Sequence, residues 1–193
     1  MATREILYCG HPVLRRKAKR VRNVDDALLA LIEDMKQTMV EAPGVGLAAP
    51  QLGESVRVIV VRADDEEDTE IHALLNPHIA ERSGQEGAME GCLSLPTLRG
   101  EVPRAASVVA VGTTPEGGEI SIHADGLLAR ALQHEVDHLD GVLFLDRALR
   151  ETLCWVVPDE DEEDGYRLDG TTVEEVTERF RRLQERRARR QGG

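Results

Sequence analysis

The chain has 193 residues, of which 41% are apolar and 31% charged, so it is long enough for one globular domain with or without a tail, and two large domains are excluded. The net charge of -12 comes from two short segments, because residues 64–70 and 159–164 carry six acids each. The remaining 24 acids balance the 24 bases. No apolar run has the length of a membrane span, the N-terminus lacks an apolar signal core, and three cysteines are too few for a disulfide framework. We therefore expect a cytoplasmic protein with no membrane partner. Aromatic residues, which could stack on bases, make up only 3% of the chain, and we expect no DNA partner.

The first predicted element is an amphipathic helix over residues 25–40, where apolar side chains recur at helical spacing. Pro43 and the glycines of GVGLAAPQ (44–51) end this helix and begin a tight, irregular segment. Three short segments rich in β-branched residues are predicted to be strands: 56–61, 106–111 and 119–124. The turn residues at 114–118 favour antiparallel pairing of the last two.

A second helix is predicted over residues 125–139, with Asp125 as its N-cap and Gly141 just past its end. Its apolar residues lie almost all round, so we expect it in the middle of the domain. An acidic loop, a strand-like piece and a last helix with an arginine-rich end follow residue 150. The expected organisation is a compact unit over residues 1–150, with the acidic loop and basic-tailed helix of residues 151–193 packed on it.

The strongest local pattern is His134-Glu135-Val136-Asp137-His138. Histidines at i and i+4 lie on one face of a helix and can bind one metal ion, while the glutamate between them can reach a water on that ion. A metal lowers the pKa of water, so Glu135 can generate a nucleophile without being a strong base. The pattern indicates hydrolysis of a carbonyl compound, against the simpler interpretation of a surface helix that carries these residues by coincidence.

A catalytic metal site generally takes three protein ligands, so a third must be found. Downstream, Asp137, Asp140 and Asp146 are candidates, but neighbours on the same short helix point poorly toward the metal. Upstream, Cys92 lies in Glu-Gly-Cys-Leu-Ser (90–94), where a thiolate beside a glycine has room to approach a metal ion. The alternative for a lone cysteine is a small buried apolar residue.

The segment GVGLAAPQ lacks the Lys and Ser/Thr of a phosphate loop, which argues against nucleotide binding. Its small residues permit close backbone packing. The side-chain amide of Gln51 can donate to an oxygen that develops negative charge, and the backbone N–H of Leu93 is a second candidate donor.

Together the three segments resemble the peptide deformylase family. The family pattern is Gly-Φ-Gly-Φ-Ala-Ala-x-Gln, Glu-Gly-Cys-Φ-Ser and His-Glu-Φ-Asp-His in that order, where Φ is apolar, and all three motifs are present over residues 3–150 without a mismatch. The resemblance implies removal of the formyl group from N-formylmethionyl nascent peptides, with release of formate. It implies that Glu135 is the general base and then the proton donor to the leaving amine. The implied metal ligands are Cys92, His134 and His138. The implied oxyanion hole is formed by Gln51 and the Leu93 amide.

The resemblance also implies Fe(II) as the physiological metal, with zinc, nickel or cobalt able to substitute. A thiolate and two imidazoles do not choose among these ions by geometry alone. The residues that match the family's substrate site are Val45, Gly46, Glu90, Arg99, Leu127, Arg130 and Ala131. Within this set, Val45, Leu127 and Ala131 with the His134 ring match an apolar methionine pocket, and Gly46 matches the place where the substrate backbone lies.

Three arginines around this pocket have open interpretations. Arg130 is a charged residue among positions that match an apolar pocket wall. It either lies at the pocket rim or is a solvated helix residue. Arg99 is a candidate for contact with the peptide and Arg104 a candidate partner for Glu90, although both are also compatible with ordinary surface arginines.

The C-terminal segment departs most from the family. Some members dock on the ribosome through a basic terminal helix, and here residues 158–170 intervene before such a helix. Its seven arginines either contact ribosomal RNA or form a solvated face.

Two other functions compete with deformylation. A zinc endopeptidase would need a third ligand downstream of the helix motif, and a catalytically silent, ribosome-associated metal protein would have lost Glu135 or Gln51, which are both present. The expected fold is α+β, with antiparallel strands around a central helix that carries the two histidines, an N-terminal amphipathic helix, and a C-terminal helix packed outside.

Overall fold

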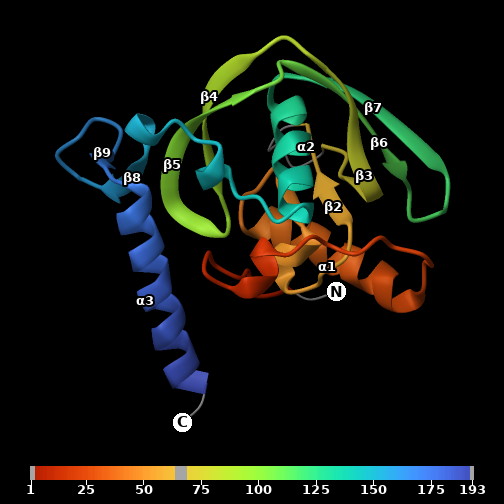
Figure 1. Cartoon of the computed structure of the whole chain (residues 1–193), viewed down its shortest axis with the longest axis horizontal. Coiled ribbons are helices and arrows are strands. Elements are labelled where there is room, and N and C mark those ends of the chain that lie inside the picture. Colours follow the sequence, from red (N-terminus) through yellow and green to blue (C-terminus); the bar gives the residue numbers. More distant parts are fainter. Residues whose placement is uncertain (1–2, 64–68, 192–193) are drawn as a thin grey trace.

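The computed structural model describes residues 3–63 and 69–191, so most of the acidic run 64–70 lies outside the described residues. Figure 1 shows strands that arch over one central helix, with two further helices outside. The helices are α1 (Asp26–Glu41), α2 (Gly126–Leu139) and α3 (Val173–Gln191). Short 3₁₀ helices lie at Pro12–Arg15, Ala49–Leu52, Phe144–Asp146 and Arg150–Thr152.

The described strands form two antiparallel sheets. The five-stranded sheet has the order β1-β2-β3-β6-β7, formed by β1 (Gly46–Ala48), β2 (Val58–Val61), β3 (His72–Ser83), β6 (Ser107–Thr113) and β7 (Glu119–Asp125). The four-stranded sheet has the order β4-β5-β8-β9, formed by β4 (Glu86–Cys92), β5 (Leu95–Arg104), β8 (Cys154–Pro158) and β9 (Tyr166–Gly170). The predicted α+β fold is confirmed.

The elements with strong local signals form where the sequence predicts them. The Asp25 carboxylate caps α1 by accepting from the Leu28 amide at 2.9 Å, and Met35 and Met39 are fully buried on the inner face of that helix. The turn between β6 and β7 is closed by the Thr114 amide, which donates to the Gly118 carbonyl at 2.8 Å. The predicted hairpin at 114–118 is therefore confirmed.

Strands with weak local signals were not predicted. β3, β4 and β5 contain glycines, prolines or charged residues, which lower β propensity. They form because of their partner strands: β3 pairs with β2 and β6, and β4 pairs with β5. The prediction of an irregular 44–51 segment is wrong in part, since Gly46 pairs with Val61 in the short strand β1 before the chain turns into a 3₁₀ helix.

The central helix α2 is buried along most of its length. From Ala131 to Leu139 every residue is buried, and the apolar ones pack against the five-stranded sheet. Asp125 occupies the N-cap position as predicted, without a cap hydrogen bond from its side chain among the described residues. The expectation that the helix is buried all round is wrong at its start, because Leu127 is 49% exposed.

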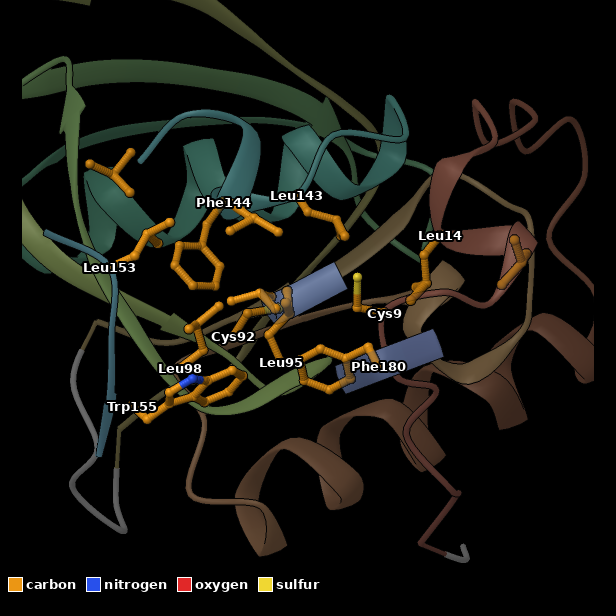
Figure 2. Close-up of a cluster of buried hydrophobic side chains, with 14 residues drawn as sticks. Cys9, Leu14, Cys92, Leu95, Leu98, Leu143, Phe144, Leu153, Trp155 and Phe180 are labelled. Carbon is orange, nitrogen blue, oxygen red and sulfur yellow. The ribbon is translucent and has the colours of Figure 1, made fainter. Parts of the chain in front are cut away.

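A second cluster of buried apolar residues joins the four-stranded sheet to α3. Figure 2 shows Trp155 and Phe180 on one side of this cluster, with Cys92 and Phe144 inside it. Phe180 anchors α3, and the guanidinium of Arg179 lies over the Trp155 ring at 4.1 Å. None of the helices among the described residues is both long and apolar enough to cross a bilayer.

Candidate metal centre and pocket

Cys92, His134 and His138 come together in the structure. Cys92 ends β4, while the two histidines lie one turn apart on the buried face of α2. One ligand atom from each lies within 4.8 Å of the others, and the Cys92 Sγ is 3.2 Å from His138 Nε2. One thiolate and two imidazoles at this spacing fit a transition-metal ion.

The hairpin between β4 and β5 directs Cys92 toward the helix. The register between these strands shifts between Glu90 and Cys92, so that Cys92 pairs directly with Leu95. Irregularities of this kind bend a strand and change the direction of a side chain. The two histidines need no such adjustment, because the i, i+4 spacing puts both rings on one face of α2.

Glu90 orients His134. Its Oε2 accepts from His134 Nδ1 at 2.9 Å, which leaves Nε2 of that ring for a metal. Arg104 donates to both Glu90 oxygens, at 2.5 and 3.0 Å. Burial opposes ionisation of Glu90, but the hydrogen bonds from His134 and Arg104 hold its pKa at about 2. The carboxylate is thus a fixed anion behind the histidine.

Glu135 lies between the histidines, beside β1. A Cβ on Gly46 would come within 2.5 Å of Glu135 Oε1, so only glycine fits where β1 passes this carboxylate. Glu135 Oε2 makes no hydrogen bond to any described residue. Burial raises the pKa of Glu135 to about 7, in the range that suits proton transfer at neutral pH.

Gln51 is held from both ends. Its Oε1 accepts from the Ala48 amide at 2.8 Å, and its Nε2 donates to Ser94 Oγ at 3.2 Å and toward Cys92 Sγ at 3.7 Å. The side chain is 1% exposed. An amide N–H therefore points at the sulfur ligand from a rigid position.

A pocket of about 480 Å³ opens onto this cluster. All the site residues predicted from the sequence line it except His138, which is buried. Leu127, at the mouth, is half exposed, while Ala131 and Gln51 are buried in the wall. The concave, mixed apolar and polar lining is typical of a substrate site.

The position of Arg130 differs from both sequence interpretations. It lines the pocket, but its guanidinium is neither free in solvent nor only at the rim, because it donates to Glu90 Oε1 at 2.7 Å and to the Val102 and Glu86 carbonyls at 2.8 and 3.0 Å. Arg130 thus ties α2 to β4 and β5. Arg104 is the partner of Glu90 that the sequence predicts.

Several residues of the site were missed by sequence reasoning. Ser94 holds Gln51, and Met89 and Thr97 line the pocket. Ser94 is the last residue of the Glu-Gly-Cys-Leu-Ser motif, and its place in that motif is the sequence signal for its role. Met89 and Thr97 carried no signal, because β4 and β5 were not predicted as strands.

The downstream acids are engaged elsewhere. Asp137 accepts from Arg104 and Arg147, Asp140 from Arg57, and Asp146 from Arg15. Among the described residues, the only group with metal-binding geometry is the one with Cys92. The third-ligand arrangement of a zinc endopeptidase is therefore not favoured.

Comparison with known proteins agrees with this geometry. The sequence matches the polypeptide deformylase family over residues 3–152. A peptide deformylase of Natranaerobius thermophilus is 54% identical over 77% of this chain and 94% of its own length. One from Thermomicrobium roseum is 43% identical over 89% of this chain and 100% of its own length.

A solved structure shows the same fold. The crystal structure of a peptide deformylase from Legionella pneumophila is 42% identical, with a TM-score of 0.74 over 77% of this chain and 87% of that chain. The chain belongs to the polypeptide deformylase family, the metal-dependent hydrolases that remove the formyl group from the N-terminal formylmethionine of newly synthesised polypeptides.

Proposed function

We propose that Cys92, His134 and His138 hold a ferrous ion and that Glu135 beside them performs the proton transfers of deformylation. The observation that carries this assignment is the convergence of the three ligand atoms within 4.8 Å next to a buried carboxylate. A divalent metal there supplies Lewis-acid chemistry and lowers the pKa of water toward neutrality. Iron is the family's common metal, and zinc, nickel or cobalt ions suit the same donors.

Glu135 acts twice in this scheme. Its carboxylate first accepts a proton from the attacking water, and it then delivers that proton to the nitrogen of methionine as the bond to the formyl carbon breaks. Its burial and the close passage of Gly46 keep the carboxylate in one position. The products are formate and a free amino terminus.

Gln51 and the backbone N–H of Leu93 stabilise the negative charge that develops on the formyl oxygen. Preorganised donors are effective because they need no reorientation during the reaction. The hydrogen bonds from Ala48 and to Ser94 supply this preorganisation for Gln51.

The pocket receives the methionine side chain between Val45, Leu127 and Ala131, with Gly46 beside the substrate backbone and Arg99 near the peptide that follows. Glu90 has a positioning role in this proposal, and not the substrate contact that the family resemblance suggests. Its oxygens are occupied by His134, Arg104 and Arg130.

The test compares metal-loaded wild type with Glu135→Gln. Each is loaded anaerobically with Fe(II), its metal content is measured, and formate release from a formyl-Met tripeptide is followed. We expect the variant to retain the metal and to lose about 10²- to 10⁴-fold in kcat, as for removal of a general base. Turnover by the variant equal to that of wild type would overturn the role of Glu135.

The identity of the metal needs its own measurement. Protein purified anaerobically without added metal is assayed for iron, zinc, nickel and cobalt together with its activity. We expect activity to follow iron content. Activity that follows zinc content, with iron absent, would overturn the choice of Fe(II).

We also propose that the basic end of α3 docks on the ribosome. Figure 1 shows α3 leaving the body of the molecule beyond its packed first turns, and Arg182 and Arg186 on it are exposed. Exchange of Arg182 and Arg186 for Glu should weaken co-sedimentation with ribosomes and leave turnover of a short formyl peptide unchanged. Undiminished co-sedimentation would contradict this docking.

A further inference from the structure

A basic strip, residues 15–22, lies on the surface of this acidic protein. Six of its eight residues are Lys or Arg, and the chain holds no acid between Glu5 and Asp25. All six basic side chains are exposed, whereas Ala18 is buried and Val21 packs against the core. The strip therefore presents its charges outward while its small and apolar residues face the core.

The backbone of the basic strip is fixed. The Ala18 amide donates to the Leu139 carbonyl at the end of α2, and the Lys19 amide donates to the Ser55 carbonyl. The Asn76 side chain binds both backbone polar groups of Val21. It accepts from the Val21 amide at 2.8 Å and donates to the Val21 carbonyl at 3.0 Å. Lys19 also forms an isolated bridge with Val56. The charges thus sit on a backbone that is held in place, so binding a partner would cost little entropy for ordering the strip.

Most of the positive charge is uncompensated. Arg15 pairs with Asp146, and Lys17 lies 3.8 Å from Asp140. In the described part of the chain, the other four basic side chains form no ion pair or side-chain hydrogen bond: Arg16, Lys19, Arg20 and Arg22. A hollow in the surface is lined by residues 19–22.

We propose that the basic strip binds the phosphate backbone of RNA. A cluster of exposed cations with few acidic partners matches the charge of a polyanion. The strip contains no aromatic residue for stacking on bases, so it contacts phosphates and is indifferent to sequence. The enzyme acts on nascent peptides, which emerge from an RNA-rich particle, and this selects RNA as the source of the phosphates.

The basic strip is distinct from both the pocket and the helix α3. It joins α2 at Leu139, the last residue of the helix, whereas the pocket is lined by earlier residues of α2, from Leu127 to Glu135. The chain that leads into the strip lies against α3, where Gln184 donates to the Tyr8 carbonyl at 3.0 Å. Contacts of RNA with the strip therefore add to docking through α3 and can be removed separately.

The test uses the full-length, metal-loaded protein and a short fluorescein-labelled RNA duplex, with binding followed by anisotropy over a range of salt concentrations. The strip variant replaces the four unpaired residues by Gln: Arg16, Lys19, Arg20 and Arg22. The control variant removes the same charge elsewhere, by Gln at Lys36, Arg82, Arg150 and Arg167. Both variants should retain wild-type formate release, because none of these residues lines the pocket.

We expect the slope of log K against log salt to become shallower by about 3 in the strip variant, since each phosphate contact contributes about 0.7 to 0.9. The control variant should keep the wild-type slope. Equal slopes in wild type and strip variant, or equal losses in both variants, would overturn the proposal. Binding is also measured to a DNA duplex and to polyglutamate. Tighter binding to either of these than to the RNA would overturn the proposal, because the strip would then be a site for DNA or for an acidic protein.

Discussion

Arg130 shows how one residue can connect the pocket to the metal centre. Its guanidinium contacts Glu90, which orients His134, and the carbonyls of Glu86 and Val102 in the opposite wall. The Arg130 side chain is 13% exposed, and its hydrogen bonds to Glu90 and Val102 are partly buried. Arg130 thus links α2 to β4 and β5 and holds the anion behind a metal ligand, and we expect this link to set the width of the pocket.

Replacement of Arg130 by Met keeps the apolar stem and removes the guanidinium. The wall between α2 and β4 should loosen, because two carbonyls lose a charged donor. We expect the preference for formyl-Met over formyl-Phe peptides, measured as a ratio of kcat/KM, to fall about tenfold, the equivalent of about one charged hydrogen bond. Arg130→Lys should recover part of the preference. An unchanged ratio in Arg130→Met would show that the arginine does not set the pocket width.

Gly46 is the second residue on which the site depends, because it has no Cβ atom. An added methyl group would come 2.5 Å from Glu135 Oε1, so Gly46→Ala must displace the carboxylate. Because small displacements of catalytic groups are costly, kcat should fall by about 10²-fold while metal content stays constant. Gly170→Ala is the matched control, since a Cβ there meets nothing within 4 Å. Full activity in Gly46→Ala would contradict the close fit.

Helices α1 and α2 can be predicted from local sequence signals, whereas strands such as β4 and β5 form because of pairing between distant segments. α1 and α2 follow from periodicity and caps, and the ligands on α2 follow from their spacing. The pairing of β4 with β5 could not be predicted, because their glycines and prolines disfavour strands and only the partner strand compensates. The contacts of Arg130 with β4 and β5 depend on that pairing and are therefore not evident from the sequence.

The docking of α3 depends on a few large side chains. Phe180 is 3% exposed and lies among Trp155 and Tyr8, with ring centroids 6.2 and 6.3 Å away. Phe180→Ala should lower the free energy of unfolding by about 3 kcal/mol, measured in urea, because it leaves a cavity in the cluster that joins α3 to the four-stranded sheet. Leu168→Ala, at a residue 55% exposed, should change it by less than about 0.5 kcal/mol. Equal effects of the two substitutions would mean that α3 does not pack as described.

At the scale of the whole molecule, the metal centre joins two parts of the fold. Cys92 belongs to the four-stranded sheet, while the two histidines lie on a helix packed against the five-stranded sheet. A metal bound to the folded state alone stabilises it by mass action, by about 4 kcal/mol at a free concentration about 1,000 times its Kd. The centre therefore contributes to stability as well as to chemistry.

Removal of the metal by a chelator should lower the melting temperature of the wild-type protein, measured by calorimetry. Cys92→Ser replaces the sulfur ligand by a poorer one, so chelation should change its melting temperature much less. An equal shift in both proteins would show that Cys92 does not hold the ion.

We propose that this site hydrolyses the formyl group and leaves peptide bonds intact. The most direct measurement compares two tripeptides, formyl-Met-Ala-Ser and acetyl-Met-Ala-Ser, with Fe(II)-loaded wild type, and follows formate, acetate and internal cleavage products together. We expect rapid release of formate, and acetate release lower by about 10²-fold, because the extra methyl group on the reacting carbon has to fit beside the buried Glu135 carboxylate. Release of internal fragments, or no formate from the metal-loaded enzyme, would contradict the account.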